Sequence, residues 1–166
     1  MKRTERNSKD LFSTLLLLFF ITSCVSKTGY TEYKSVLKEG LGTSPVVFDL
    51  PEEVVQSQRK NVFIRLQNDN SYPYSNIFLL VSLVGGDEVL IQDTLEYAMA
   101  APDGTWLGKG FTELKESKLW WKEGVVFPEK RPLKIKVAQA VRNNGSAEGV
   151  FKLEGILSIG ISIEDQ

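Results

Sequence analysis

The residue whose type and position most directly predict chemistry is Cys24, the single cysteine of a 166-residue chain that contains no histidine. Without histidine, the chain cannot form a Ser-His-Asp triad, a Cys-His nucleophile pair or a histidine-containing zinc site. One cysteine cannot form an internal disulfide or a CxxC redox pair. The composition therefore excludes several classes of enzyme and leaves modification of the one thiol as the reaction to consider.

The segment before Cys24 has the parts of a secretory signal peptide. Four basic residues lie among the first nine, and the apolar run Leu11–Ile21 follows them. This run is too short to cross a bilayer as a helix, which needs about 20 residues. A basic start, a short apolar run and small residues before a cleavage site are typical of a signal peptide, which we place at residues 1–23.

The residues Ile21-Thr22-Ser23-Cys24 resemble the lipobox of bacterial lipoproteins, in which an aliphatic and two small residues precede an obligatory cysteine. The resemblance implies that the Cys24 thiol is alkylated with a diacylglyceryl group and that the peptide bond before it is cut. Cys24 is then an acylated N-terminus, with palmitate as the expected type of chain. Two or more acyl chains hold a protein on a membrane stably. The alternative is a free cysteine near an ordinary signal cleavage site.

Processing also changes the charge of the chain. The full sequence carries 20 basic and 21 acidic side chains, and residues 1–23 contain four of the basic and two of the acidic ones. The mature chain therefore carries 16 basic and 19 acidic groups, a formal net charge of −3. Neither the net charge of the full sequence nor that of the mature chain gives an electrostatic reason to expect binding to nucleic acid or to anionic lipid.

The remainder is predicted to contain one tether and one domain. Residues 24–45 are polar and lack clear periodicity, so we interpret them as the lipidated N-terminus and a tether. Tyr30, Tyr33 and Val36 are unusual for a pure linker and favour packing of part of this segment on the domain. The length and a hydrophobic content of 42% suit one packed domain, which we place at residues 46–166.

Period-two runs separated by turn residues predict that this domain is built from strands. Only Thr112–Trp121 has near-helical spacing, and it is interpreted as one short helix or turn. The expected fold is therefore all-β, an antiparallel β-sandwich of Greek-key or jelly-roll type with at most one short helix. The predicted strands span residues 46–50, 61–67, 77–84, 89–99, 133–142 and 153–163.

Two aromatic stretches are candidate binding sites. Tyr72 and Tyr74 lie in the polar loop 67–76, where rigid aromatic rings suit a binding loop, although the turn-forming residues favour a plain hairpin connection. Trp106, Trp120 and Trp121 fall within sixteen residues, as in a sugar platform or an interface hot spot. The alternative is that these aromatic residues close the open end of the sandwich.

No catalytic or metal-binding constellation is evident. Asp69 between two asparagines suggests calcium, but the spaced acidic residues of an ion-binding loop do not follow it. Pairs of adjacent carboxylates, such as Asp87-Glu88, sit where like charges are normally solvated. We therefore expect a protein that is not an enzyme, binds no metal and has no cofactor apart from the lipid on Cys24.

The string NVFIRLQNDNSYPYSNIFLLV (residues 61–81), with DTLEY (93–97), PDGTWLG (102–108) and KVAQAVR (136–142), resembles the gliding-motility lipoprotein family GldH of the Bacteroidetes. The resemblance covers about Phe48 to Ile163, and the lipobox agrees with it. It implies a cell-envelope lipoprotein required for gliding, a process linked to type IX secretion, with other gliding or envelope lipoproteins as partners. It implies no enzyme activity and carries no established binding residues.

The expected location is the periplasmic face of the outer membrane. Val25 follows the cysteine, so the aspartate that retains lipoproteins in the inner membrane of some bacteria is absent. The next residues also lack an acidic cluster resembling a surface-export tag. The alternative function is a glycan-binding module of the envelope, and a hydrolase would need two carboxyl groups facing each other across a cleft.

Overall fold

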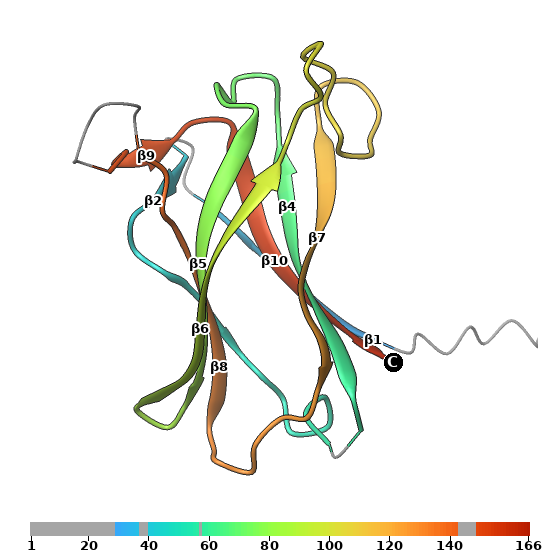
Figure 1. Ribbon diagram of the computed structural model, residues 1–166, viewed down its shortest axis with the longest axis vertical. Coiled ribbons are helices and arrows are strands. Elements are labelled where there is room, and N and C mark those ends of the chain that lie inside the picture. Colours follow the sequence, from blue (N-terminus) through green and yellow to red (C-terminus); the bar gives the residue numbers. More distant parts are fainter. Residues whose placement is uncertain (1–28, 37–39, 57, 143–148) are drawn as a thin grey trace, which may run out of the picture.

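Two four-stranded antiparallel sheets pack face to face in the computed structural model, which describes residues 29–36, 40–56, 58–142 and 149–166 (Figure 1). Sheet I has the strand order β1-β10-β4-β7, and sheet II has the order β3-β8-β5-β6. A short pair, β2-β9, lies beside them. The strands are β1 Gly29–Ser35, β2 Leu41–Gly42, β3 Val46–Asp49, β4 Lys60–Asn68, β5 Asn76–Gly85, β6 Glu88–Ala98, β7 Lys115–Val125, β8 Leu133–Gln139, β9 Lys152–Leu153 and β10 Ile156–Asp165.

The core lies between the two sheets because alternate side chains of the strands point inward. On β4 these are Val62, Ile64 and Leu66, which are almost fully buried, and β10 and the strands of sheet II contribute corresponding rows. Burial of these rows is the main source of stability for a fold of this type. The inward-facing residues of β10, β5 and β8 include Ile159, Ile161, Ile163, Ile77, Leu79, Val81, Leu83, Ile135 and Val137.

The predicted fold class is confirmed: the described chain is all-β, its paired strands are antiparallel, and the two main sheets form a sandwich. Each of the six predicted strand runs contains a strand. The last run is divided, because Glu154 and Gly155 turn the chain between β9 and β10. Gly155 is required there, since its φ is 74° and a Cβ would lie 2.1 Å from the backbone nitrogen of Tyr72.

The predicted helix at 112–121 is wrong, because most of this segment belongs to β7. Its burial follows a period of two: Leu119 and Trp121 are buried, whereas Lys118 and Trp120 are exposed. Pairing with β4 places Leu119 beside Ile64 in the core. The near-helical spacing in the sequence was overridden by the burial of alternate residues against the opposite sheet.

The sandwich begins at Gly29, earlier than the predicted boundary at residue 46. Within the segment interpreted as a tether, β1 pairs with β10 over seven residue pairs. Tyr30 packs against the core, and the Lys34 ammonium donates a hydrogen bond of 2.6 Å to the Val47 carbonyl oxygen of β3. The tyrosines noted in the sequence were the signal for this strand. The predicted signal peptide and Cys24 lie outside the described residues.

The side of the sandwich where β6 faces β7 is closed by side chains rather than by backbone pairing. The Tyr97 hydroxyl donates to the Trp120 carbonyl oxygen, and the Trp121 indole N–H donates to an Asp93 carboxylate oxygen at 2.9 Å. Lys122 forms an ion pair with the same Asp93 at 3.1 Å. The Trp120 carbonyl oxygen, a backbone group at the edge of β7, is thereby occupied and is less open to pairing with another chain.

Among the residues that the structure describes, none form a helix with the length and apolar character needed to cross a membrane.

Candidate binding surface

Three of the five predicted binding residues meet at one end of the sandwich, which we name the loop end and which is the top of Figure 1. The rings of Tyr72 and Tyr74 contact each other edge to face with 5.7 Å between centroids, and Trp106 lies 6.2 Å from Tyr72. The Trp106 indole N–H donates to the Asn70 side-chain oxygen at 3.1 Å. We name Tyr72, Tyr74 and Trp106 the aromatic cluster.

The aromatic cluster closes the core more than it presents a surface. Tyr72 is only 3% exposed, and its hydroxyl donates to the Asn76 carbonyl oxygen at 2.7 Å. Burial raises the pKa of Tyr72 above its usual value of 10.0. The prediction of Tyr72 as a partner-binding residue is therefore corrected: its ring fills the space beneath the loop, so a partner cannot reach it.

The polar loop beside the cluster is held by its own turn. The Asp69 carboxylate accepts hydrogen bonds from the Ser71 backbone N–H at 2.8 Å and from the Ser71 hydroxyl at 2.5 Å. This is the local bonding expected of an aspartate in a turn. In the described parts of the chain, no three His, Cys, Asp or Glu side chains gather as a metal site requires.

The two tryptophans of β7 point in opposite directions. Trp121 is 7% exposed and bonded to Asp93, so it belongs to the core and is also corrected as a partner-binding residue. Trp120 is 46% exposed on the outer face of sheet I. There it contacts Phe63 edge to face, with 4.7 Å between ring centroids, and the Lys118 ammonium lies 3.9 Å from the centroid of the Phe63 ring. Trp120 is thus available to a ligand.

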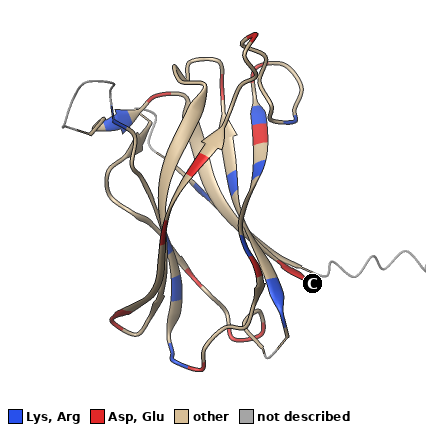
Figure 2. Ribbon diagram, viewed as in Figure 1, with Lys and Arg blue, Asp and Glu red and all other residues tan. Residues whose placement is uncertain are grey.

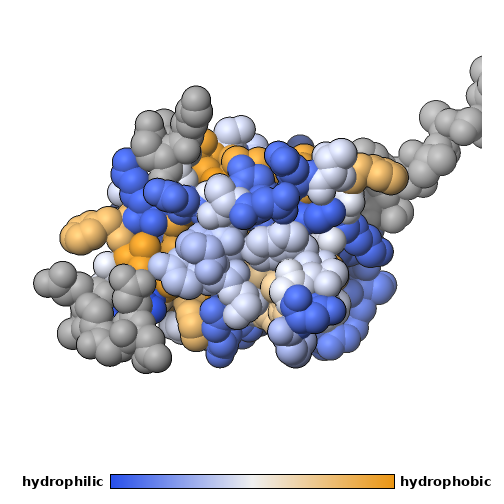
Figure 3. Space-filling view, turned by 90° about the horizontal axis from the view of Figure 1, so that it is seen from above, coloured by the Kyte–Doolittle hydropathy of each residue, from blue (hydrophilic) through white to orange (hydrophobic). Residues whose placement is uncertain are grey.

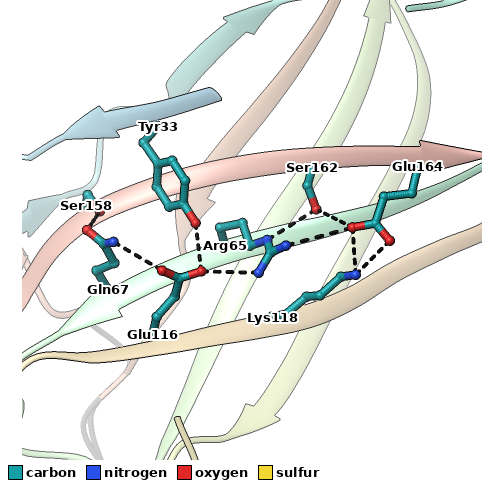
Figure 4. Close-up of polar contacts among 8 residues, drawn as sticks. All are labelled: Tyr33, Arg65, Gln67, Glu116, Lys118, Ser158, Ser162 and Glu164. Carbon is teal, nitrogen blue, oxygen red and sulfur yellow. Dashed lines mark hydrogen bonds and ion pairs between the residues drawn. The ribbon is translucent and has the colours of Figure 1, made fainter. Parts of the chain in front are cut away.

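The outer face of sheet I also carries a row of polar side chains that the sequence analysis missed (Figure 4). The row runs across all four strands of the sheet, and neighbouring members are joined by hydrogen bonds or ion pairs. We name it the polar ladder. Its members are Tyr33, Arg65, Gln67, Glu116, Lys118, Ser158, Ser162 and Glu164.

Glu116 is the centre of the polar ladder. Its carboxylate accepts hydrogen bonds from the Arg65 guanidinium at 3.1 Å, the Gln67 amide at 3.3 Å and the Tyr33 hydroxyl at 2.8 Å. Burial and this carboxylate together raise the pKa of Tyr33 to about 12. Because these residues sit on different strands and pair only across the sheet, their spacing in the sequence contains no signal of the network.

The opposite end of the ladder is an ion cluster around Glu164. Its carboxylate lies 2.6 Å from the Lys118 ammonium and 3.8 Å from the Arg65 guanidinium. The groups are partly exposed, so each pair adds little stability by itself. The cluster places Arg65 and Lys118 on the outer face of sheet I, with their charges balanced by Glu116 and Glu164.

An open groove of about 700 Å³ lies beside the first half of β7, between the polar ladder and the loop 99–114. We name it the β7 groove. Leu107 is 57% exposed and Phe111 is 93% exposed at its edge, and we name these two residues the apolar rim. The space-filling view of the loop end shows a mostly hydrophilic surface with small, separate hydrophobic patches (Figure 3). The groove is lined by Arg65, Ala98, Leu107, Lys109, Gly110, Phe111, Glu116, Ser117, Lys118 and Leu119.

Backbone hydrogen bonds fix the loop that carries the apolar rim. Lys109 and Glu116 exchange two N–H to carbonyl bonds of 2.8 Å, so the loop extends the sheet beyond the edge of β7. The Leu107 N–H donates to the Met99 carbonyl oxygen at 2.9 Å. Thr112, directly after Phe111, has a φ of 58°, which is rare for a β-branched residue and stores backbone strain.

The chain matches the family model described as GldH lipoprotein over residues 29–163. It belongs to the GldH lipoprotein family. The match begins at the first residue of β1 and ends within β10, so the matched region coincides with the sandwich, and the predicted resemblance is confirmed.

Two relatives support this membership. The chain is 45% identical to the gliding motility lipoprotein GldH of Flavobacterium johnsoniae over 162 residues, covering 97% of this chain and 98% of the relative. It is 40% identical to a GldH homolog of Christiangramia forsetii over 159 residues, covering 96% and 97% of the two chains. Membership of a lipoprotein family supports a membrane-anchored location in the cell envelope.

Proposed function

We propose that this GldH-family chain is a lipid-anchored, non-enzymatic component of the gliding-motility machinery. The observation that carries the proposal is the match over nearly the whole chain to a relative named as a gliding motility lipoprotein. The setting of Cys24 after Ile-Thr-Ser agrees with it, because the thiol is the atom that a diacylglyceryl group would alkylate. The protein acts by holding other envelope proteins at the membrane rather than by transforming a substrate.

The sandwich is well suited to a stationary anchoring role. Five residue steps separate Cys24 from Gly29, a contour of at most about 18 Å. From Gly29 onward, β1 is hydrogen-bonded to β10 along its length. A pulling force between the lipid and a bound partner therefore acts on an entire strand pair inside a packed domain. The proposed partners are other gliding or envelope lipoproteins.

The proposed location is the periplasmic face of the outer membrane, with a link to type IX secretion. The presence of Val25 after the cysteine, in place of an aspartate, supports this location. The secretion link predicts that cells lacking the chain release less type IX cargo as well as failing to glide. Protease treatment of intact cells tests the location, since a domain on the periplasmic face is protected until the outer membrane is opened.

Replacement of the anchoring thiol tests the proposed function. In cells whose single copy carries Cys24→Ala, we expect the protein to leave the membrane fraction and the cells to stop gliding. Ser26→Ala is the matched control, because it changes a nearby small residue and retains the thiol. Normal gliding by Cys24→Ala cells, with the protein in the soluble fraction, would contradict the proposal.

A glycan-binding module is the second candidate function, and the observation in its favour is Trp120. Its ring is exposed on the broad outer face of sheet I beside Phe63, as a sugar platform requires. Envelope polysaccharide that quenches the tryptophan fluorescence of the wild-type protein, and not that of Trp120→Ala, would favour this function. The leading proposal predicts no such quenching.

A further inference from the structure

We propose that the β7 groove binds a partner protein through an acidic and apolar segment, in which an aliphatic or aromatic side chain is flanked by a carboxylate. The inference rests on the proposed function, because it identifies the surface and partner chemistry of a chain that acts by binding. The residues proposed to contact the partner are Leu107 and Phe111 of the apolar rim, and not those of the aromatic cluster.

Large apolar side chains next to the groove are unusually exposed. Of the nine large hydrophobic residues that are exposed in the described chain, four fall between residues 107 and 120. The loop that carries Phe111, a side chain 93% exposed, is held by backbone hydrogen bonds, so little backbone freedom is lost when the ring is covered. Of these four, Leu107 and Phe111 line the same groove, and exposed apolar side chains around one groove favour an interaction site there.

The groove lies far along sheet I from the point at which the lipid-anchored chain enters the sheet. The chain enters sheet I at Gly29, level with Asn61 of β4, whereas β7 and its loop begin beside Asn68. Seven residues of strand separate these two levels, which corresponds to about 23 Å. The groove thus lies toward the end of the sheet away from the anchor. This placement favours a protein partner over the membrane that holds Cys24.

The basic residues of the groove favour a partner segment that carries an anionic group. The Lys109 ammonium forms no ion pair with any described residue, and Arg65 and Lys118 also line the groove. The one carboxylate in the lining, that of Glu116, is already occupied by three donors. Basic and acidic residues alternate along the upper part of β7 (Figure 2). Of the charged residues that line the groove, Arg65, Lys118 and Glu116 are in ion pairs, and Lys109 is not. An anionic group beside an apolar side chain complements this surface.

The size of the groove fits a segment rather than a broad docking face. An open volume of about 700 Å³ accommodates one or two side chains with their backbone. The partner's apolar side chain would lie against the apolar rim, and its carboxylate would reach Lys109.

Site-specific photo-cross-linking in living cells tests the inference with the full, lipidated chain. We would place p-benzoylphenylalanine at Phe111 and, in a separate strain, at Leu107. Phe151, 78% exposed beside β9, is the matched control position. Cross-linked products would be identified by mass spectrometry, including the partner peptide that carries the cross-link.

The expected result is one heterologous protein cross-linked at Phe111 and Leu107 and not at Phe151, through a peptide that contains a carboxylate next to an apolar residue. Lys109→Glu should lower the yield roughly tenfold, and Lys136→Glu on sheet II should leave it unchanged. Phe111→Ser should weaken the cross-link at Leu107 about 30-fold, as expected for the loss of a central contact residue.

Four results would overturn the inference: a product with a second copy of the chain, a product with phospholipid, equal products at Phe111 and Phe151, or no product. These outcomes are distinguishable from failure of the proposed function. If Cys24→Ala abolishes gliding while Phe111 gives no specific product, the anchoring role stands and the assignment of the groove fails.

Discussion

The aromatic cluster and the apolar rim are neighbours at one end of the sandwich, yet they differ in almost every physical respect. Tyr72 is buried, and the polar atoms of Tyr72 and Trp106 are hydrogen-bonded within the domain. Phe111, a few residues along the same connection as Trp106, projects into solvent beside an unpaired lysine. Aromatic content alone therefore does not identify a binding surface; what distinguishes the two regions is whether the domain already satisfies its side chains.

The largest expected effect is the loss of stability when the aromatic cluster is opened. Tyr72→Ala removes a buried ring and leaves the Asn76 carbonyl oxygen without its donor. We expect the free energy of unfolding to fall by about 3–5 kcal/mol, as for other deletions of buried aromatic rings. Urea unfolding followed by circular dichroism measures this change. A loss below about 1 kcal/mol would mean that the cluster is not part of the core.

A smaller loss is expected at β7, where two adjacent tryptophans provide an internal comparison. Trp121→Phe removes the indole donor to Asp93 and some packing volume, so the free energy of unfolding should fall by about 1–2 kcal/mol. Trp120→Phe keeps an aromatic ring against Phe63 at an exposed position and should change it by less than about 0.5 kcal/mol. Equal effects of the two substitutions would contradict the assignment of opposite faces.

The half-buried Tyr97 predicts a loss of stability at alkaline pH. Burial and the nearby Asp93 carboxylate raise the pKa of Tyr97 to about 12, compared with 10.0 in the unfolded chain. The folded state therefore favours the neutral phenol, and this contribution is complete below pH 10 and is lost as the pH rises from 10 through 12. Unfolding curves at pH 9, 10.5 and 12 measure the decline. Tyr97→Phe should make the decline of the free energy of unfolding with pH shallower. An unchanged decline would contradict the assignment of this pH dependence to Tyr97.

The smallest effect on stability is expected at the apolar rim. Because Phe111 is almost fully exposed, Phe111→Ser should change the free energy of unfolding by no more than about 0.5 kcal/mol. Thermal unfolding of the purified domain measures this. A destabilisation similar to that of Tyr72→Ala would show that Phe111 packs against the domain, and the distinction between the two regions would disappear.

Most of the fold was predictable because strand burial follows a period of two. The alternation of Val62, Ile64 and Leu66 in β4 is visible in the sequence and is the pattern that the structure buries. β7 was not predictable in the same way, because charged residues and two adjacent tryptophans hid its alternation. β1 was hidden because its inward row includes Glu32 and Lys34, polar residues at the margin of the core.

The candidate surface was less accessible to sequence reasoning. The polar ladder depends on pairing between strands distant in the sequence, so Arg65 and Glu116 have no recognisable spacing. Phe111 follows a glycine in a loop, which gives no indication whether a side chain folds inward or outward. For Trp120 the sequence left a binding surface and closure of the sandwich as alternatives. The structure places it on the outer face, because its neighbours on β7, Leu119 and Trp121, face the core.

We propose that the chain works by binding a partner through the exposed apolar rim of a stable, anchored domain. The decisive measurement is the gliding of cells whose single copy of the gene encodes Phe111→Ser. Colony spreading and single-cell gliding would be measured together with the amount of protein in the membrane fraction, with Phe151→Ser as the matched control. We expect Phe111→Ser cells to lose gliding while the anchored protein stays at its normal level, and Phe151→Ser cells to glide normally. Normal gliding of Phe111→Ser cells, or a loss that occurs only when the protein itself disappears, would contradict it.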